Sequence, residues 1–356
     1  MRKIMKKPII LFLSAILSFL IQTMILCYLN NFYFTNDTQL TFKEVNLKPV
    51  APANLEIKLE PDAKNIILSS SGKYCSYYSE KKLSIINLVD GSKNSLDLDK
   101  DLKNYYFKWH NTEDKMIISE KTVENNKAGV KIYTYNPKNN SKQEALNYNN
   151  ESEIYKLPTS NAVVSGIDLN TMNTIMYLKV SNSKASSSLQ RLDISEGMNQ
   201  LDINTNKVGN FFVIKQKDEI IYENLQDNKI YITDKSKNTE IKVPGYENLK
   251  LLYVDKSDTA FIGEVQNNMI TKIFKKNFDG ASEENTWSSL SLENPVSAEN
   301  LHISNYGKVY VIDNFKGTAE NVQDKTKVTF EGNFITINDS EILSSYEEKL
   351  IVTPLK

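Results

Sequence analysis

Cysteine, histidine and glycine are scarce in this sequence: its 356 residues include two cysteines, two histidines and twelve glycines. The cysteines are Cys27, in a long apolar run, and Cys75, in a strand-like segment. A bridge between two such segments is not expected on geometric grounds, so a disulfide framework is excluded. The histidines, His110 and His302, have no Cys or His at ligand spacing, which predicts structural or surface roles for both.

The motifs of common catalytic sites are also missing. The sequence contains no Gly-x-Ser-x-Gly nucleophile elbow and no Gly-rich phosphate loop or Walker pattern. Two isolated histidines leave little material for a Ser-His-Asp site. We therefore predict that the protein is not an enzyme. The sequence assigns no catalytic, cofactor-binding or metal-binding residue, and it implies no cofactor.

One acidic segment has the alternating pattern of a calcium site, and a second acidic pair follows a predicted strand. Asp97–Asp101 alternates aspartate with other residues as a calcium loop does, but Leu102 stands where such a loop needs Gly, and Lys108 where it needs Glu. This segment is therefore predicted to be an acidic loop between strands. Asp193 and Glu196 are interpreted as an ordinary strand exit.

The charge balance excludes nucleic acid as a partner. The formal net charge is −1, and removing the four basic residues near the amino end leaves 39 basic against 44 acidic side chains. Such a surface repels phosphate backbones, and no basic stripe interrupts it.

One long apolar run lies near the amino terminus. Residues 8–29 carry no charge, and at about 1.5 Å per residue a helix of this length reaches roughly 33 Å, enough for a hydrocarbon core of ~30 Å. A cleaved signal peptide would have a shorter apolar stretch and a small-x-small cleavage site, which the ending Ile25–Leu29 lacks. The run is therefore predicted to be an uncleaved transmembrane signal-anchor.

The flanking charges predict the orientation of this segment. Four basic residues precede it, and the first basic residue after it is Lys43, so the positive-inside rule places the amino terminus in the cytoplasm. The predicted organisation is a cytoplasmic tail at 1–7, a transmembrane helix at 8–29, a stalk at 30–53 and an extracytoplasmic domain at 54–356.

Beyond the stalk the chain is a succession of short strands rich in Ile, Val, Tyr and Phe, bounded by Asn, Asp, Gly and Ser. Strand-turn-strand units recur at intervals of roughly 40 to 60 residues, close to the period of propeller blades. The turns of these units fall at Gly72-Lys73, Asp114-Lys115, Met172-Asn173, Lys217-Asp218, Asp258-Thr259 and Gly307-Lys308. No extended window shows helical apolar spacing.

One four-stranded sheet cannot cover both of its faces, whereas radial stacking buries each face against a neighbour. The expected fold is thus an all-β propeller of four-stranded blades. The six turns favour six blades, with seven as the alternative. Val328–Glu331 and Phe334–Ile337 are predicted to form a late hairpin, and the tail strands are expected to complete the last blade with the segment Leu55–Leu59. The polar stretch Ser181–Ser188 is interpreted as a long hairpin loop.

Two units resemble the repeats of TolB-type, WD40-like β-propellers. The residues concerned are Ser71-Gly72-Lys73-Tyr74 with Leu83–Gly91, and Trp109 followed by Asp114-Lys115-Met116-Ile117-Ile118. The Pro and Gly of the family's turn are missing after Trp109. The match covers about residues 65–135. The resemblance implies a bacterial propeller with a tendency to bind partners, and it carries over no functional residue.

The sequence thus predicts a membrane-anchored extracytoplasmic propeller that acts as a protein-binding or scaffold module of the bacterial cell envelope. Its expected partners are another envelope protein or a cell-wall polymer. Two alternatives stay open: a propeller hydrolase or lyase with a site in the central channel, and a ligand-sensing regulatory ectodomain. The tyrosines at 74, 77, 78, 105 and 106 are predicted to pack between blades, the alternative being an exposed binding surface.

Overall fold

The computed structural model describes residues 6–28, 57–124, 127–170, 175–183, 186–193, 195–233, 237–279 and 286–355. The chain divides into two compact units, Met1–Ala51 and Pro52–Lys356. The first contains helix α1 (Lys6–Tyr28). Within the described part of the chain no helix is long and apolar enough to qualify as a membrane span, so the predicted transmembrane helix at 8–29 is not confirmed. The predicted stalk, 30–53, lies outside the described residues.

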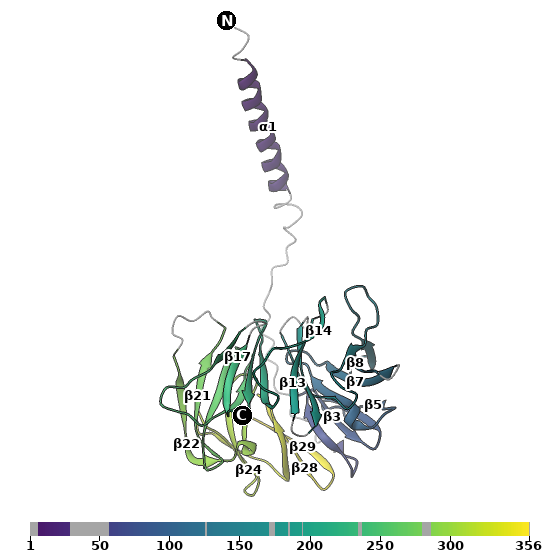
Figure 1. The fold of residues 1–356 in the computed structure, drawn as a ribbon, viewed down its shortest axis with the longest axis vertical. Helices are drawn as coiled ribbons and strands as arrows, with labels where there is room; N and C mark the ends of the chain where they lie inside the picture. The colour runs from purple at the N-terminus through teal and green to yellow at the C-terminus, as the bar shows by residue number, and fades with distance from the viewer. Residues whose placement is uncertain are drawn as a thin grey trace. The chain divides into compact units, whose positions relative to one another are not determined.

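The second unit is a β-propeller of seven blades, each a separate antiparallel sheet (Figure 1). The all-β propeller prediction is confirmed, and the preference for six blades is wrong. Blade 1 contains β2 (Lys64–Leu68), β3 (Tyr74–Ser79), β4 (Lys82–Asn87) and β5 (Lys93–Asp97). Blade 2 contains β6 (Tyr105–Trp109), β7 (Met116–Glu124), β8 (Lys127–Asn136), β9 (Ser141–Glu144) and the additional β10 (Tyr155–Lys156). Blade 3 contains β11 (Val163–Leu169), β12 (Ile175–Ser183), β13 (Ser186–Asp193) and β14 (Gly197–Gln200).

The remaining blades follow the same order along the chain. Blade 4 contains β15 (Val208–Ile214), β16 (Glu219–Asn224), β17 (Lys229–Thr233) and β18 (Asn238–Glu240). Blade 5 contains β19 (Leu249–Val254), β20 (Thr259–Gln266), β21 (Met269–Asn277) and β22 (Ser288–Val296). Blade 6 contains β23 (Leu301–Ile303), β24 (Val309–Asp313), β25 (Thr318–Asn321) and β26 (Lys327–Thr329). Blade 7 contains β27 (Asn333–Ile337), β28 (Glu341–Tyr346), β29 (Lys349–Pro354) and β1 (Ile57–Lys58). Two 3₁₀ turns, η2 (Leu102–Asn104) and η3 (Ala298–Asn300), precede β6 and β23.

The ring closes by pairing the two ends of the propeller. β1 runs antiparallel to β29, with Ile57 opposite Leu350 and Lys58 opposite Lys349. The prediction that Leu55–Leu59 helps to complete the last blade is confirmed for its described residues. As a result the first blade, with β3, lies beside the last, with β28 and β29 (Figure 1). β2 contacts β27.

Two local predictions are wrong. The segments around Val328 and Phe334 do not form one hairpin, because the first belongs to β26 in blade 6 and the second to β27 in blade 7. Gly332, between them, has φ +79° and lies against the carbonyl oxygen of Ser345, where a side chain would clash. The polar run predicted as a long loop continues β12 and β13, whose pairing extends to Ser183 opposite Ser186.

The hydrophobic core is divided among the seams between blades. Each of the seven clusters of buried apolar side chains joins two neighbouring blades. Because successive strand residues point to opposite faces, one strand supplies two seams: in β12, Leu178 packs toward blade 2 and Tyr177 toward blade 4. Each sheet therefore buries its apolar faces only against its neighbours in the ring.

The tyrosines near the amino end of the propeller mostly follow the packing prediction. Tyr77 and Tyr105 are buried, and Tyr74 and Tyr78 pack against the seam between blades 1 and 2. Tyr106 packs against the next seam and also lines a cavity. Among the first strands, β6 contacts β11, β11 contacts β15, β15 contacts β19 and β27 contacts β2, as expected of strands that surround the central channel of a propeller.

Candidate functional site

The central channel holds a cavity of about 330 Å³ at the end that carries the turns between first and second strands. We call this end the first-turn face. The cavity is lined by the ends of first strands and by the following turns of blades 1, 2, 5, 6 and 7: Ile67–Ser70, Tyr106–Asn111, Tyr253, Ile303–Asn305 and Thr336–Asn338. Its wall combines aromatic rings with amides and hydroxyls.

A buried carboxylate joins three blades beside this cavity. Asp168, at the end of β11, has a side chain that is 3 % exposed. It pairs with Lys108 Nζ of blade 2 at 2.6 Å and with Lys215 Nζ of blade 4 at 3.4 Å. It also accepts hydrogen bonds from Asn111 Nδ2 at 3.2 Å and from the backbone N–H of Val213 at 2.8 Å.

The charge state of Asp168 follows from these contacts. Burial alone would raise the pKa of this carboxyl, but Lys108 and Lys215, with the hydrogen bonds, hold it well below its usual range. Asp168 is therefore ionised at neutral pH and acts as a fixed tie between blades 2, 3 and 4.

On the first-turn face, aspartates tie the turns of neighbouring blades together at three places among the described residues. Asp114 of blade 2 accepts the hydroxyls of Ser69 and Ser71 of blade 1, at 2.8 and 2.7 Å. The same pattern recurs farther along the chain, since Asp258 accepts the backbone N–H groups of residues 215 and 216, and Asp339 that of residue 306. Each tie joins the turn of one blade to the turn of the next.

The Trp109 and Asp114 pair on which the TolB-type resemblance rests has a structural role here. The Trp109 indole N–H contacts Ser76 Oγ at 3.0 Å and the carbonyl oxygen of Ile67 at 3.2 Å. Both acceptors belong to blade 1, as do the partners of Asp114. These two residues therefore fasten blade 2 to blade 1.

The contacts of His110 and His302 indicate structural roles for both histidines. His110 is 4 % exposed, and its Nδ1 accepts the backbone N–H groups of Thr112 and Glu113 at 3.2 and 3.1 Å. His302 packs on the ring of Phe334, with ring centroids 4.5 Å apart, and burial lowers its pKa. Among the described residues no group of three or more His, Cys, Asp or Glu side chains is placed to hold a metal ion.

The acidic residues Asp97–Asp101, Asp193 and Glu196 are not among those that line the channel cavity. The segment containing Asp99 connects β5 to η2 and is the predicted loop between blades. Asp193 and Glu196, predicted to be an ordinary strand exit, bind Arg191 at 2.7 and 2.8 Å. The Arg191 side chain is 5 % exposed, and its guanidinium also pairs with Asp218 of blade 4 at 2.8 Å.

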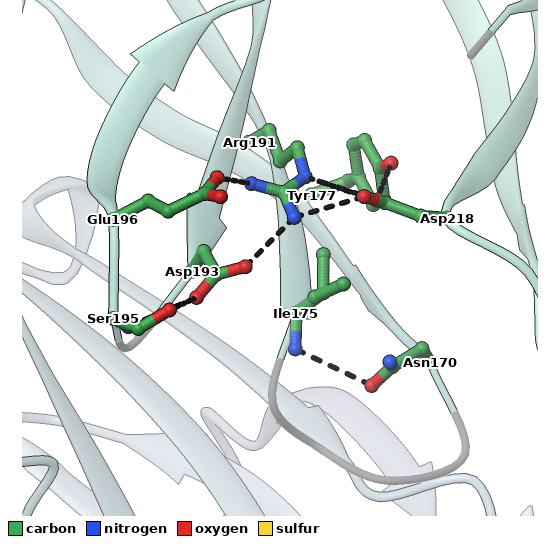
Figure 2. A network of polar contacts seen from close by, with 8 residues as sticks. All are labelled: Asn170, Ile175, Tyr177, Arg191, Asp193, Ser195, Glu196 and Asp218. Carbon is green, nitrogen blue, oxygen red and sulfur yellow. Dashed lines mark hydrogen bonds and ion pairs between the residues drawn. The ribbon is translucent and has the colours of Figure 1, made fainter. Parts of the chain in front are cut away.

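Figure 2 shows Arg191 between Asp218 on one side and Asp193 and Glu196 on the other. The hydroxyl of Tyr177 donates to Asp218 at 2.5 Å. Burial alone would raise the pKa of Asp193, but its bonds to Ser195 and Arg191 lower it to about 2. This cluster is a polar clamp between blades 3 and 4, and sequence reasoning missed it.

Sequence reasoning also missed the residues of the channel. Asp168 carried one signal, because it is the single charged residue of the strand Val163–Leu169. Arg191 carried another, since it is the only arginine besides Arg2. Nothing in the sequence distinguishes Lys108, Lys215 or the cavity-lining amides from ordinary surface residues.

Comparisons with known proteins support the fold and leave the family open. No family model and no curated protein matches the chain. The solved structures similar to it include the mitotic checkpoint complex, at 11 % identity and a TM-score of 0.49 over 85 % of this chain and 93 % of that one. They also include TolB from Acinetobacter baumannii, at 13 % identity and a TM-score of 0.38 over 66 % of this chain and 55 % of that one.

A study of two prolyl endopeptidases supplies a further similar structure, with 9 % identity and a TM-score of 0.50. The match covers 83 % of this chain and 46 % of that chain, so this chain spans less than half of the endopeptidase. Identity this low shows a shared fold and carries no activity across.

Proposed function

We propose that this protein is a non-catalytic binding module that engages its partner at the channel mouth on the first-turn face. The observation that carries the proposal is the 330 Å³ cavity to which five blades contribute aromatic, amide and hydroxyl groups. Ligand sites are typically concave, with a few convergent polar groups set among apolar ones.

The chemistry of the cavity favours binding over catalysis. A general acid or base works best when its pKa is near the operating pH. The pKa of Asp168 is held far below neutral pH, so this carboxylate stays ionised. His110 Nδ1 is engaged by two backbone N–H groups. Burial raises the pKa of Glu341 to about 7, but Glu341 is not among the residues that line the cavity.

We also propose where the module acts and what it binds. The charge-free run at 8–29 and the basic residues before it support a cell-membrane location with the propeller outside. The partner proposed for that location is an envelope protein or a cell-wall polymer. A relation to the TolB-type propellers is proposed on the Trp109 and Asp114 pattern.

Photocrosslinking tests this function. Tyr306, 67 % exposed beside the cavity-lining Asn305, is replaced by p-benzoylphenylalanine, which reacts with C–H bonds of proteins and polysaccharides alike. The matched control places the same amino acid at Phe315, an exposed aromatic residue of the same blade in the turn between β24 and β25, at the opposite end of the ring.

After irradiation of cells, the proposal predicts one adduct of defined mass from position 306, recovered with the membranes, and none from position 315. Mass spectrometry of the adduct identifies the partner. Equal labelling from both positions, or labelling from position 315 alone, rejects binding at the channel mouth. An adduct found only in the soluble fraction rejects the proposed location.

A further inference from the structure

One lysine side chain extends across the channel mouth. Lys256 belongs to the turn between β19 and β20 of blade 5, and its backbone N–H donates to the carbonyl oxygen of Asn305 in blade 6 at 3.0 Å. Its Nζ lies 4.9 Å from the ring centroid of Tyr306 and 3.4 Å from Ser70 Oγ of blade 1. The side chain thus reaches from blade 5 to blade 1, with blades 6 and 7 between them in the ring.

The ammonium group of Lys256 has no carboxylate partner among the described residues, unlike Lys108 and Lys215, which both pair with Asp168. Its one hydrogen bond, to Ser70, is long, and the Ser70 hydroxyl proton is already donated to the carbonyl oxygen of Asn111 at 2.7 Å. Two N–H groups of the ammonium therefore have spare donor capacity.

The carboxylates nearby are already engaged by backbone donors. Asp255 accepts the N–H groups of residues 257 and 259 at 2.9 Å each, Asp258 accepts those of residues 215 and 216, and Asp339 accepts that of residue 306. These bonds fix the carboxylates in the turns. The Lys256 ammonium, in contrast, has donors to spare and no carboxylate partner among the described residues, and a carboxylate is the natural partner of such a cation.

We propose that the channel mouth binds a carboxylate group, with Lys256 as its counter-ion and the cavity beneath holding the rest of a small ligand. This inference rests on the proposed function and specifies the ligand class of the same site. At 330 Å³ the cavity lies near the lower end of the range of about 300–1,000 Å³ for ligand pockets, so it suits a small dicarboxylic acid or the last residues of a chain.

These two sources share one chemistry, and separate probes distinguish them. Ligand-observed NMR with the full-length protein measures binding of succinate, of acetyl-alanyl-alanine with a free carboxylate, and of the same dipeptide as its carboxamide. We expect at least one acid to bind with a Kd of about 1 mM, and the carboxamide to bind at least about tenfold more weakly, because a charge-assisted hydrogen bond is lost. Stronger binding of succinate indicates a free acid, and stronger binding of the dipeptide indicates a chain terminus.

Two lysine variants test the assigned counter-ion. Lys256→Met keeps most of the side chain and removes the charge, so we expect acid binding to weaken about tenfold. Lys316→Met is the matched control, since Lys316 lies in the turn between β24 and β25, its side chain is 73 % exposed and it pairs with Asp313. Acid binding by this variant should equal that of the unmodified protein.

Equal binding of the acid and the carboxamide overturns the inference, and so does unchanged acid binding by Lys256→Met. Absence of binding by both acids at about 10 mM, a concentration that would saturate a site of about 1 mM affinity, also overturns it. If the Tyr306 position nevertheless crosslinks to a partner, the binding function stands and only the carboxylate assignment fails. If the acids bind and no crosslink forms, the partner-binding function fails instead.

Discussion

Arg191→Met is expected to lower the free energy of unfolding by about 3 kcal/mol, toward the lower end of the range for breaking a buried ion pair. The reason is that several carboxylates pair with the single cation of Arg191. The side chain of Arg191 is 5 % exposed, and those of Asp193 and Asp218 are 15 % and 28 % exposed. Without Arg191 these carboxylates, with Glu196, repel one another at the seam between blades 3 and 4.

Denaturant titration measures this effect against a matched control. Lys229→Met removes an ion pair with Glu240 in which the lysine side chain is 47 % exposed, and it should cost less than about 1 kcal/mol. The double variant Arg191→Met with Asp218→Asn should cost less than the sum of its single variants, because both act on one interaction. A loss below about 1 kcal/mol for Arg191→Met would show that the clamp does not hold the two blades together.

Glu341→Gln is expected to stabilise the protein by about 2 kcal/mol at pH 8 and to have little effect at pH 4. Glu341 begins β28, and its carboxyl lies against Gly72 of blade 1 and beside Asn338. Its other close ionisable neighbour is Cys75, whose pKa is raised to about 12 by burial and by the field of Glu341. No ion pair to Glu341 is found among the described residues, so no cation compensates its charge at this seam.

The direction of the pH effect follows from proton binding. Burial raises the pKa of Glu341 from 4.5 to about 7, although Asn338 opposes the shift. The folded protein keeps this proton up to about pH 7, whereas the unfolded chain loses it near 4.5. Stability from this group is therefore complete below pH 4.5 and falls as the pH rises through 7. The value of about 2 kcal/mol is smaller than the full linkage term because the group is partly reached by solvent.

Thermal unfolding of the unmodified protein and of Glu341→Gln, each at pH 4 and pH 8, tests this prediction. Glu331→Gln, at an exposed position of the turn before β27, controls for the loss of one negative charge. The gain from Glu341→Gln should grow between the two pH values, while the effect of Glu331→Gln should stay small at both. A gain that is the same at both pH values would mean that Glu341 does not titrate between them.

The strands could be predicted from the sequence because strand chemistry is local. Runs such as Tyr74–Tyr78 alternate between two buried faces, and turn residues interrupt them. The blade count failed at one place. Gly332-Asn333 has the composition of a hairpin turn but links blades 6 and 7. The strand that follows it is therefore assigned to a hairpin with Val328, and the turn Asn338-Asp339-Ser340 is not counted as the start of a seventh blade.

The site could not be predicted, because ring closure alone brings its residues together. Lys256 and Ser70 are 186 residues apart, and Asp168 is 60 residues from Lys108. Strand periodicity says which face a side chain occupies, but it does not say which distant strand will stand opposite. Only the arrangement of seven blades around one axis determines those neighbours.

The channel and its mouth depend on the pairing of β1 with β29, and an engineered disulfide tests this pairing most directly. Lys58→Cys and Lys349→Cys place two thiols at opposite positions of the pair, in a chain that also carries Cys27→Ser and in which Cys75 is fully buried. The control pair, Lys82→Cys and Asp97→Cys, occupies the corresponding position within blade 1. A closed ring predicts that mild oxidation links residues 58 and 349 as completely as residues 82 and 97, and that the link stabilises the protein by about 2–4 kcal/mol. If the control pair oxidises while residues 58 and 349 remain free thiols, the ring is not closed by β1.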